Sequence, residues 1–276
     1  SNPDLFVKFV QQLSPVVSKD VIEKIEYIEA GVYKWYYQLG QYKARRKKVP
    51  AEMLHEFEEF KEKASAVIAD LEAYLNEEYV LYLENQELAC KVKIIIRCLQ
   101  NRVYFIDHIH HNHRTYKKVR EKRMKENLEW VCQELYPDEK IIIWAHNLHI
   151  FKQYKTFTGF EPLGAIVSNK IKKQSYYLGL FMYEGEIHTD TGQPYKIEKP
   201  PKKSLEDYMH QVQSPALFTD FSQLEKNSDN KWIFTKTIFL ESGTMPTLFV
   251  PRDQLDGALF VESVSPPEYL KRNKNK

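Results

Sequence analysis

The sequence has 276 residues, with 40 basic and 38 acidic side chains and a formal net charge of +2 at pH 7. This near balance gives no electrostatic basis for binding nucleic acid or an anionic membrane surface, and a hydrophobic content of 43% excludes a disordered chain. The three unpaired cysteines, the lack of a signal peptide and the absence of an apolar run of about 18 residues lead us to expect a cytoplasmic protein that spans no membrane.

Residues 1–136 are predicted to be helical almost throughout. Asn2-Pro3-Asp4 places an N-cap, a proline and an acid at the start of a first helix. Apolar residues at helical spacing then mark a second helix, a third after Pro50, a fourth over residues 85–111 and a fifth over residues 114–135. No repeat of fixed period occurs, so the pattern indicates a helical bundle rather than a solenoid.

The sequence pattern changes after Lys140. The run Ile-Ile-Ile-Trp-Ala at residues 141–145 predicts a strand that is buried on both faces. A helix is expected over residues 161–171 and a second strand over residues 176–183, and this order of strand, helix and strand is typical of a parallel sheet. Further expected elements are strands at residues 216–221, 232–240 and 258–264 and a short helix at residues 204–212 with Ser204 as its N-cap.

Together these patterns predict an α/β fold with a mostly parallel sheet, flanking helices and a large inserted all-helical bundle. We place the helical bundle region at residues 1–136 and the α/β core portion at residues 137–276. Residues 141–145 are the expected interior strand, and open α/β sheets place their chemistry at the carboxyl ends of such strands.

Two histidines and an amide follow this predicted strand, in the motif Trp144-Ala145-His146-Asn147-Leu148-His149. Such groups can hold a polar substrate, transfer a proton or bind a metal. A purely structural interpretation stays open, in which His146 satisfies buried backbone groups and His149 caps the turn that follows.

A charged helix precedes the same strand. In it Arg120 lies one turn before Met124, roughly on the side that carries the apolar residues of the helix. An arginine on an apolar stripe needs an anionic partner, either a structural carboxylate or a group of a substrate. A plain amphipathic helix is the simpler interpretation of this stretch by itself.

The charged helix and the histidine motif together resemble the erythromycin esterase family. The resemblance rests on the pattern Arg-acid-x-x-Met-x-x-Asn-Leu-x-Trp at residues 120–130, followed by Trp-Ala-His-Asn-x-His at residues 144–149. Weaker similarities are Leu-Gly at residues 163–164, Leu-Gly-Leu-Phe and Glu-Gly within residues 178–185, and Leu-Asp-Gly-Ala-Leu-Phe at residues 255–260. The helical region before residue 115 fits the family's inserted helical region in kind, though not by motif.

This resemblance implies hydrolysis of an ester, such as a macrolide lactone, by a histidine-activated water without a covalent intermediate or a cofactor. The family's proposed general base lies in an N-terminal Gly-Glu-x-x-His-Gly motif, which does not occur here; Gly185-Glu186-Ile187-His188 has one residue too few. The first strands of the sheet are expected in the same missing segment, which could be a separate chain. These 276 residues alone are therefore expected to show little esterase activity.

The resemblance also assigns roles to individual residues. His146, His149 and Arg120 are expected to orient the substrate or support the base, and Arg123 is a weaker substitute for Arg120. Trp144 and Asn147 are expected to contact the small-molecule substrate, although Asn147 fits a structural role in a turn equally well.

Two other functions stay open at this point. One is a non-catalytic helical binding module with a degenerate α/β remnant. The other is a metal-dependent enzyme built on the histidine-rich stretch 107–113, where His108 and His111 have a helical spacing that suits Zn²⁺ with one more ligand. Histidines at a helix carboxyl end also favour the helix dipole, so we assign no metal site from this pattern.

Overall fold

The computed structural model describes residues 3–13, 17–110, 113–153, 161–189 and 192–266. It divides into two compact units, Ser1–Arg123 and Met124–Lys276, each with its own hydrophobic core. The division falls inside one helix, before the boundary that the sequence predicts after residue 136.

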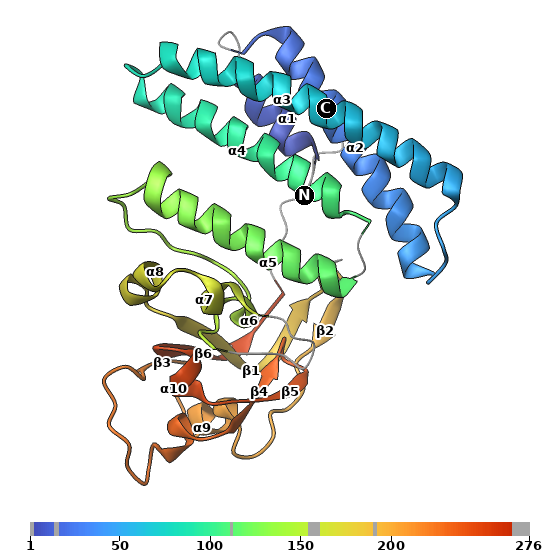
Figure 1. Ribbon diagram of the computed structural model, residues 1–276. Coiled ribbons are helices and arrows are strands. Elements are labelled where there is room, and N and C mark those ends of the chain that lie inside the picture. Colours follow the sequence, from blue (N-terminus) through green and yellow to red (C-terminus); the bar gives the residue numbers. More distant parts are fainter. Residues whose placement is uncertain (1–2, 14–16, 111–112, 154–160, 190–191, 267–276) are drawn as a thin grey trace. The chain divides into compact units, whose positions relative to one another are not determined.

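The first unit is a bundle of helices (Figure 1): α1 (Pro3–Gln11), α2 (Lys19–Ala44), α3 (Ala51–Leu81), α4 (Gln86–His108) and the first part of α5 (His113–Trp130). Ser18 and Asn85 cap α2 and α4 by accepting backbone N–H groups of the first turn at 3.4 and 3.1 Å. The predicted apolar stripes form the core, with Ile28, Ile68 and Ile95 at most 1% exposed. The helical prediction is confirmed, and no described helix is both long and apolar enough to cross a membrane.

The second unit contains a four-stranded sheet in the order β2-β1-β6-β3 and a separate β4–β5 hairpin. Their bounds are β1 (Leu178–His188), β2 (Pro194–Lys196), β3 (Ala216–Asp220), β4 (Thr237–Glu241), β5 (Met245–Phe249) and β6 (Gly257–Val264). Strands β1 and β6 are parallel, whereas the pairs β1–β2, β3–β6 and β4–β5 are antiparallel. The mixed α/β prediction is confirmed, but the described strands do not form the mostly parallel sheet that the sequence predicts.

Short helices pack around these strands. They are a π-helical turn (Val131–Leu135), α6 (Asn147–Ile150), α7 (Leu163–Ile166), α8 (Asn169–Gln174), α9 (Leu205–His210), a 3₁₀ turn (Lys231–Phe234) and α10 (Pro251–Gln254). Helix α9 packs against β1, β4 and β6, and aromatic rings fill the core between the elements. Phe151, Phe239 and Phe260 are at most 1% exposed.

The predicted interior strand at residues 141–145 is wrong for this chain. The segment adopts no regular secondary structure, and none of the described strands pairs with it. Ile142 is 91% exposed and Trp144 is 82% exposed, although such a run of large apolar residues is typical of a strand covered on both faces. The sequence predicts that residues 141–145 and β1 form a parallel pair. In the structure the parallel partner of β1 is β6, which lies near the end of the sequence.

The other elements predicted for this unit form with shifted bounds. Strands β1, β3 and β6 and helix α9 agree with the sequence pattern. The strand expected from residue 232 begins only at residue 237, after the 3₁₀ turn. The helix expected over residues 161–171 is split, because Val167 is extended and Ser168 caps α8 separately.

Candidate active site

The histidine motif lies at the start of α6, next to β1. The side-chain amide of Asn147 donates to the carbonyl oxygen of Leu180 at 2.7 Å, and the N–H of Leu180 donates back to Asn147 Oδ1 at 3.0 Å. Because the N–H and C=O of one residue point to the same side of a strand, this amide occupies the side of β1 opposite β6. Asn147 thereby fixes the position of the two histidines relative to the sheet.

Both ring nitrogens of His146 have a partner. The backbone N–H of Leu148 donates to Nδ1 at 3.3 Å, so His146 is the N-cap of α6, and Nε2 lies 3.1 Å from Oγ of Ser242. Desolvation lowers the pKa of His146, and the neighbouring charge of His149 lowers it further. The imidazole is therefore mostly neutral at pH 7, although the residue is exposed to solvent.

Ser242 comes from the β4–β5 turn, 96 residues further along the chain. It has a φ of 53°, in the left-handed region, and the next residue, Gly243, has a φ of 70°. The hydroxyl of Tyr195 on β2 donates to the carbonyl oxygen of Ser242 at 3.1 Å. No pattern in the sequence points to Ser242 or Tyr195, because a single serine and a single tyrosine carry no spacing that links them to the histidines.

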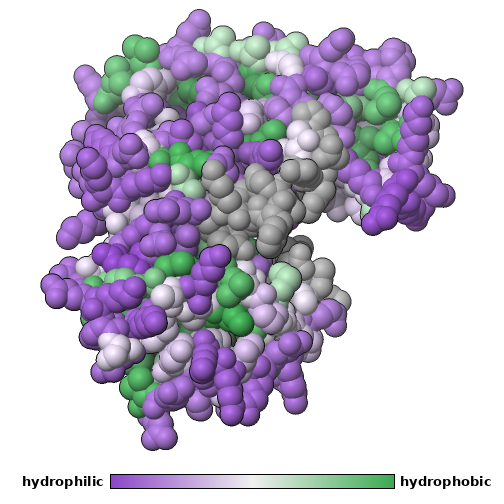
Figure 2. All heavy atoms as spheres, turned by 60° about the horizontal axis from the view of Figure 1, so that its bottom comes forward, coloured by the Kyte–Doolittle hydropathy of each residue, from purple (hydrophilic) through white to green (hydrophobic). Residues whose placement is uncertain are grey.

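An apolar groove of about 470 Å³ opens beside the motif, within the second unit. Residues 141–145 form one wall, and the start of β1 and the helices α7 and α8 form the others. Its lining includes Trp144, His149, Leu163, Val167 and Leu178. Figure 2 shows other apolar side chains gathered in small patches on a largely hydrophilic surface.

The structure thus places four of the predicted residues in the second unit, and the fifth belongs to the first unit. Trp144 and His149 line the groove, His146 lies against Ser242, and the amide of Asn147 is bound to β1. Arg120 belongs to the helical unit, where its guanidinium donates to Oε1 of the buried Glu121 at 3.1 Å. A contact of Asn147 or Arg120 with the substrate stays a prediction.

The other candidates from the sequence have structural partners. Arg123 donates to Oδ1 of Asn101 at 2.6 Å and lies over the ring of Tyr104. His108 Nδ1 lies 2.7 Å from the carbonyl oxygen of Tyr104, and the two rings stack. His111 falls outside the described residues, and within the described part of the chain no three His, Cys, Asp or Glu side chains are placed to hold a metal ion.

A second polar cluster holds the amino-terminal ends of β1 and β6 together. Asp256, from the late aspartate motif, accepts the backbone N–H of Tyr177 at 2.9 Å and pairs with the ammonium of Lys152. Desolvation, followed by the charge of Asp256, raises the pKa of Tyr177 to about 12. Because that phenol stays neutral and the carboxylate is paired, this cluster is a structural anchor of the sheet.

Comparison with known proteins gives consistent results. The sequence profile of a family described as Erythromycin esterase matches residues 5–264. A Bacillus subtilis (strain 168) protein named "Putative hydrolase YbfO" is 30% identical over 162 residues, which are 55% of this chain and 36% of that protein. The chain therefore spans little more than a third of the length of this curated relative.

Two crystal structures share the fold. One, of a succinoglycan biosynthesis protein, has a TM-score of 0.62 and 17% identity, and the similarity covers 94% of this chain and 61% of the other. The second, of a protein from Bacillus cereus, has a TM-score of 0.59 and 18% identity over 92% of this chain and 66% of the other. At this level of identity the comparison establishes the fold.

Proposed function

Because the chain belongs to the erythromycin esterase family, we propose that it forms part of a hydrolase that cleaves an ester or lactone with a histidine-activated water. A macrolide-type lactone is the substrate class we favour, which would make resistance to such an antibiotic its biological effect. The succinoglycan biosynthesis protein with the same fold offers polysaccharide biosynthesis as a second setting. We place the reaction in the cytoplasm, since Cys90, Cys98 and Cys132, all within the described residues, form no disulfide.

The observation that carries this proposal is a neutral imidazole at the start of α6, with a second imidazole from the same short helix in the adjoining groove. His146 is exposed at that point, and His149 lines the groove with mostly apolar neighbours. An apolar groove with a few polar groups at one end suits a large ester, whose apolar body is buried while its carbonyl meets the polar groups. Arg120 and Trp144 are proposed to bind the same substrate.

We place the general base outside residues 1–276. The residues that most resemble the family's base motif, Gly185 to His188, form the end of β1. Gly185 pairs with Val264 of β6, and the next three residues pair with β2, with His188 opposite Pro194. They are therefore part of a sheet ladder and not of a catalytic loop. This position supports the interpretation that the base comes from the Gly-Glu-x-x-His-Gly segment that the family carries elsewhere.

We further propose that the same segment completes the sheet beside residues 141–145. The exposed side chains of Ile142 and Trp144 support this, because a run of this kind is typical of a strand with neighbours on both sides. The added strands would make the sheet mostly parallel. They could come from the same polypeptide or from a separate chain.

A side-by-side assay tests the proposal. Purified residues 1–276 and the product of the complete gene are given the same panel of lactones and aryl esters. We expect turnover only by the complete product, since general-base catalysis is typically worth about 10²–10⁴-fold. Equal and robust turnover by both would place the base within residues 1–276, and turnover by neither would favour the non-catalytic binding module.

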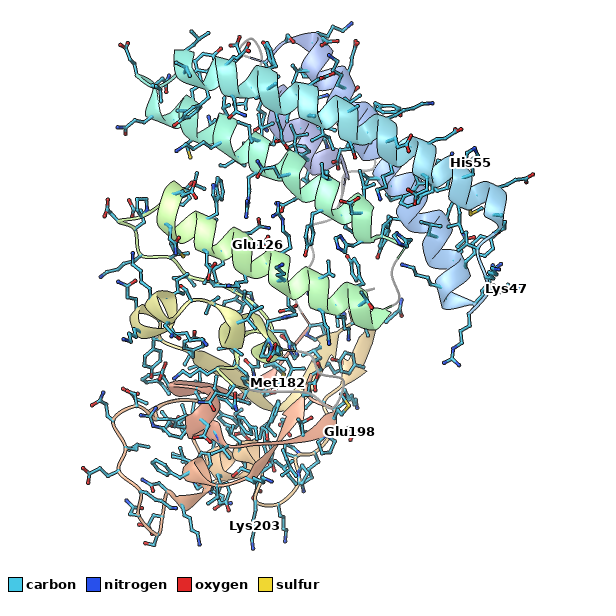
Figure 3. All side chains as sticks on the ribbon, in the orientation of Figure 1. Lys47, His55, Glu126, Met182, Glu198 and Lys203 are labelled. Carbon is cyan, nitrogen blue, oxygen red and sulfur yellow. The ribbon has the colours of Figure 1, made fainter. Side chains whose placement is uncertain are left out.

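A pair of histidine variants of the complete product separates catalysis from folding. His146→Ala should lower turnover much more than it lowers thermal stability. The matched control is His55→Ala on α3 (Figure 3), because His55 is exposed and pairs with the surface carboxylate of Glu59 at 3.4 Å. Equal losses of turnover and stability in His146→Ala would support a purely structural histidine.

A further inference from the structure

The partners of His146 define where its proton lies. The backbone N–H of Leu148 can only donate, so Nδ1 must accept and cannot carry a proton in the neutral ring. A neutral imidazole has one proton, which is therefore on Nε2. The 3.1 Å contact of Nε2 with Ser242 is then a hydrogen bond in which His146 donates to the serine oxygen.

The turn that carries Ser242 is held in place by its neighbours. The N–H of Gly243 donates to Leu240 at 3.2 Å and closes the turn, and the hydroxyl of Tyr195 donates to Ser242 itself. The N–H of Glu198 (Figure 3) donates to the carbonyl oxygen of Gly243 at 2.9 Å. A residue other than glycine in the left-handed region costs about 1–2 kcal/mol. The surrounding contacts offset this cost and keep the Ser242 oxygen beside His146.

This arrangement cannot work as a base. A general base needs a nitrogen lone pair directed at the water, but the Nδ1 lone pair of His146 is taken by Leu148 and Nε2 carries the proton. The same geometry excludes a serine nucleophile activated by His146, since the Ser242 hydroxyl accepts a hydrogen bond from the imidazole and meets no nitrogen lone pair of that ring to take its proton. An Nε2–H group can still stabilise negative charge on an oxygen.

We infer that Ser242 is a positioning residue. Its oxygen accepts the Nε2–H of His146 and holds the ring, whose tautomer the Leu148 N–H sets, in the orientation that lets His146 donate a hydrogen bond to the carbonyl oxygen of the ester substrate. This inference rests on the proposed hydrolase function. The carbonyl oxygen of the substrate accepts the Nε2–H hydrogen bond together with the Ser242 oxygen or in its place. As charge develops on that oxygen during attack by water, the neutral imidazole stabilises it without itself gaining or losing a proton.

Two substitutions at Ser242 distinguish the role of its side-chain oxygen from any effect on folding. Glycine and asparagine both tolerate a positive φ, so neither strains the turn. Ser242→Asn keeps a side-chain oxygen acceptor near Nε2, whereas Ser242→Gly removes it. Both variants should fold, and unfolding in urea checks this. Ser228→Ala, at an exposed serine whose hydroxyl donates to the neighbouring Asp229, is the unrelated serine control.

The first readout is the Nε2–H proton of His146, observed by ¹H–¹⁵N NMR on histidine-labelled protein at pH 7.5. We expect a slowly exchanging Nε2–H in the unsubstituted protein and in Ser242→Asn, and fast exchange of this proton with water in Ser242→Gly, because its acceptor is gone. A proton on Nδ1 in the unsubstituted protein, or an equally slow exchange of the Nε2–H in Ser242→Gly, overturns the inference. This readout needs no substrate, so failure of the proposed ester hydrolysis is seen separately.

The second readout is kinetic and uses the complete gene product. Because loss of one positioning hydrogen bond is worth about tenfold, kcat of Ser242→Gly should fall about tenfold with KM unchanged, and Ser242→Asn should stay near the original value. A normal kcat in Ser242→Gly contradicts the positioning role. Covalent labelling of Ser242 by an aryl fluorophosphonate would also overturn it, since a nucleophilic serine needs an unprotonated Nε2.

Discussion

Gly164 lies so close to Ile150 that a Cβ atom on the glycine would come within 2.2 Å of the Ile150 carbonyl oxygen. The first residues of α7 therefore approach the end of α6 as closely as backbones can. We expect Gly164→Ala to lower the free energy of unfolding by about 3 kcal/mol, because the clashing group is backbone and cannot rotate away. Urea unfolding of residues 1–276 measures this.

Gly40 provides the matched control for the same substitution. It lies inside α2, and a Cβ there would meet no atom within 4 Å. Gly40→Ala should therefore raise the stability of the helical unit by about 0.5–1 kcal/mol, since alanine loses less backbone entropy than glycine in a helix. Similar effects of the two substitutions would contradict the close approach at Gly164.

Replacement of the Asn147 amide by a carboxylate tests the link between α6 and β1. Asn147→Asp keeps an acceptor for the N–H of Leu180, but it places a negative oxygen against the Leu180 carbonyl in place of the donor at 2.7 Å. We expect a loss of about 1–3 kcal/mol in urea unfolding, because a partly buried carbonyl loses its partner. Asn227→Asp should change little, since the side-chain oxygen of Asn227 accepts from the N–H groups of Asp229 and Asn230, and a carboxylate keeps both acceptors.

The sequence predicts the helical unit well because its signals are local. Each stripe of apolar residues lies within one helix that the structure confirms, and Ser18 and Asn85 cap α2 and α4 within a few residues of those stripes. The strands β1 and β6 are likewise recognisable from short apolar runs. Local spacing does not identify which strands pair, and the pairing of β6 with β1 and β3 depends on residues from distant parts of the chain.

The candidate site is predictable only in part, for the same reason. Trp144, His146 and His149 follow from a compact motif, and the structure places them beside one groove and one turn. Ser242 was not predictable, because its contact with His146 arises when the β4–β5 turn folds back from 96 residues away. The strand at residues 141–145 fails because pattern alone assumes neighbours that this chain does not provide among its described strands.

The buried ion pair of the helical unit gives a further prediction. Arg102 donates through Nη2 to Glu29 Oε2 at 2.9 Å and also through Nε to Oε1, and Glu29 is only 2% exposed. Arg102→Met leaves a buried carboxylate without its partner and should cost about 3–5 kcal/mol in urea unfolding. The double variant Glu29→Gln with Arg102→Met should recover most of that loss. No recovery would show that packing of the arginine stem, rather than the charge, accounts for the effect.

Glu206 is expected to weaken the second unit at neutral pH. It is 1% exposed, and its Oε1 accepts the N–H of Leu240 at 2.8 Å, while Oε2 has no partner among the described residues. Desolvation raises its pKa above the ordinary value of 4.5. For a carboxyl group with a raised pKa, the stabilising contribution is complete below pH 4.5 and is lost as the pH rises through the folded-state pKa.

Glu206→Gln should therefore stabilise the protein at pH 7 by about 1 kcal/mol, because it keeps the acceptor for Leu240 and removes the buried charge. The gain should shrink as the pH approaches 4.5. Urea unfolding at a series of pH values measures both effects. A variant that is less stable than the original at pH 7 would mean that the carboxylate has a partner and a role of its own.

The lowered pKa of His146 has the opposite consequence for stability. Since folding favours the neutral ring, the stabilising contribution of His146 is complete above the ordinary pKa of 6.5 and declines as the pH falls below it toward the lower folded-state pKa. The pKa is lowered by desolvation of the ring and then by the charge of His149, and a proton on Nδ1 would also remove the acceptor for the Leu148 N–H. His146→Asn replaces it with a capping residue that does not titrate. We expect the free energy of unfolding to fall more between pH 7.5 and 5.5 in the original protein than in His146→Asn.

A second variant tests the neighbouring charge. His149→Asn should raise the pKa of His146 in an NMR titration, because it removes the positive charge of His149. Identical pH profiles for all three proteins would contradict the capping role of His146.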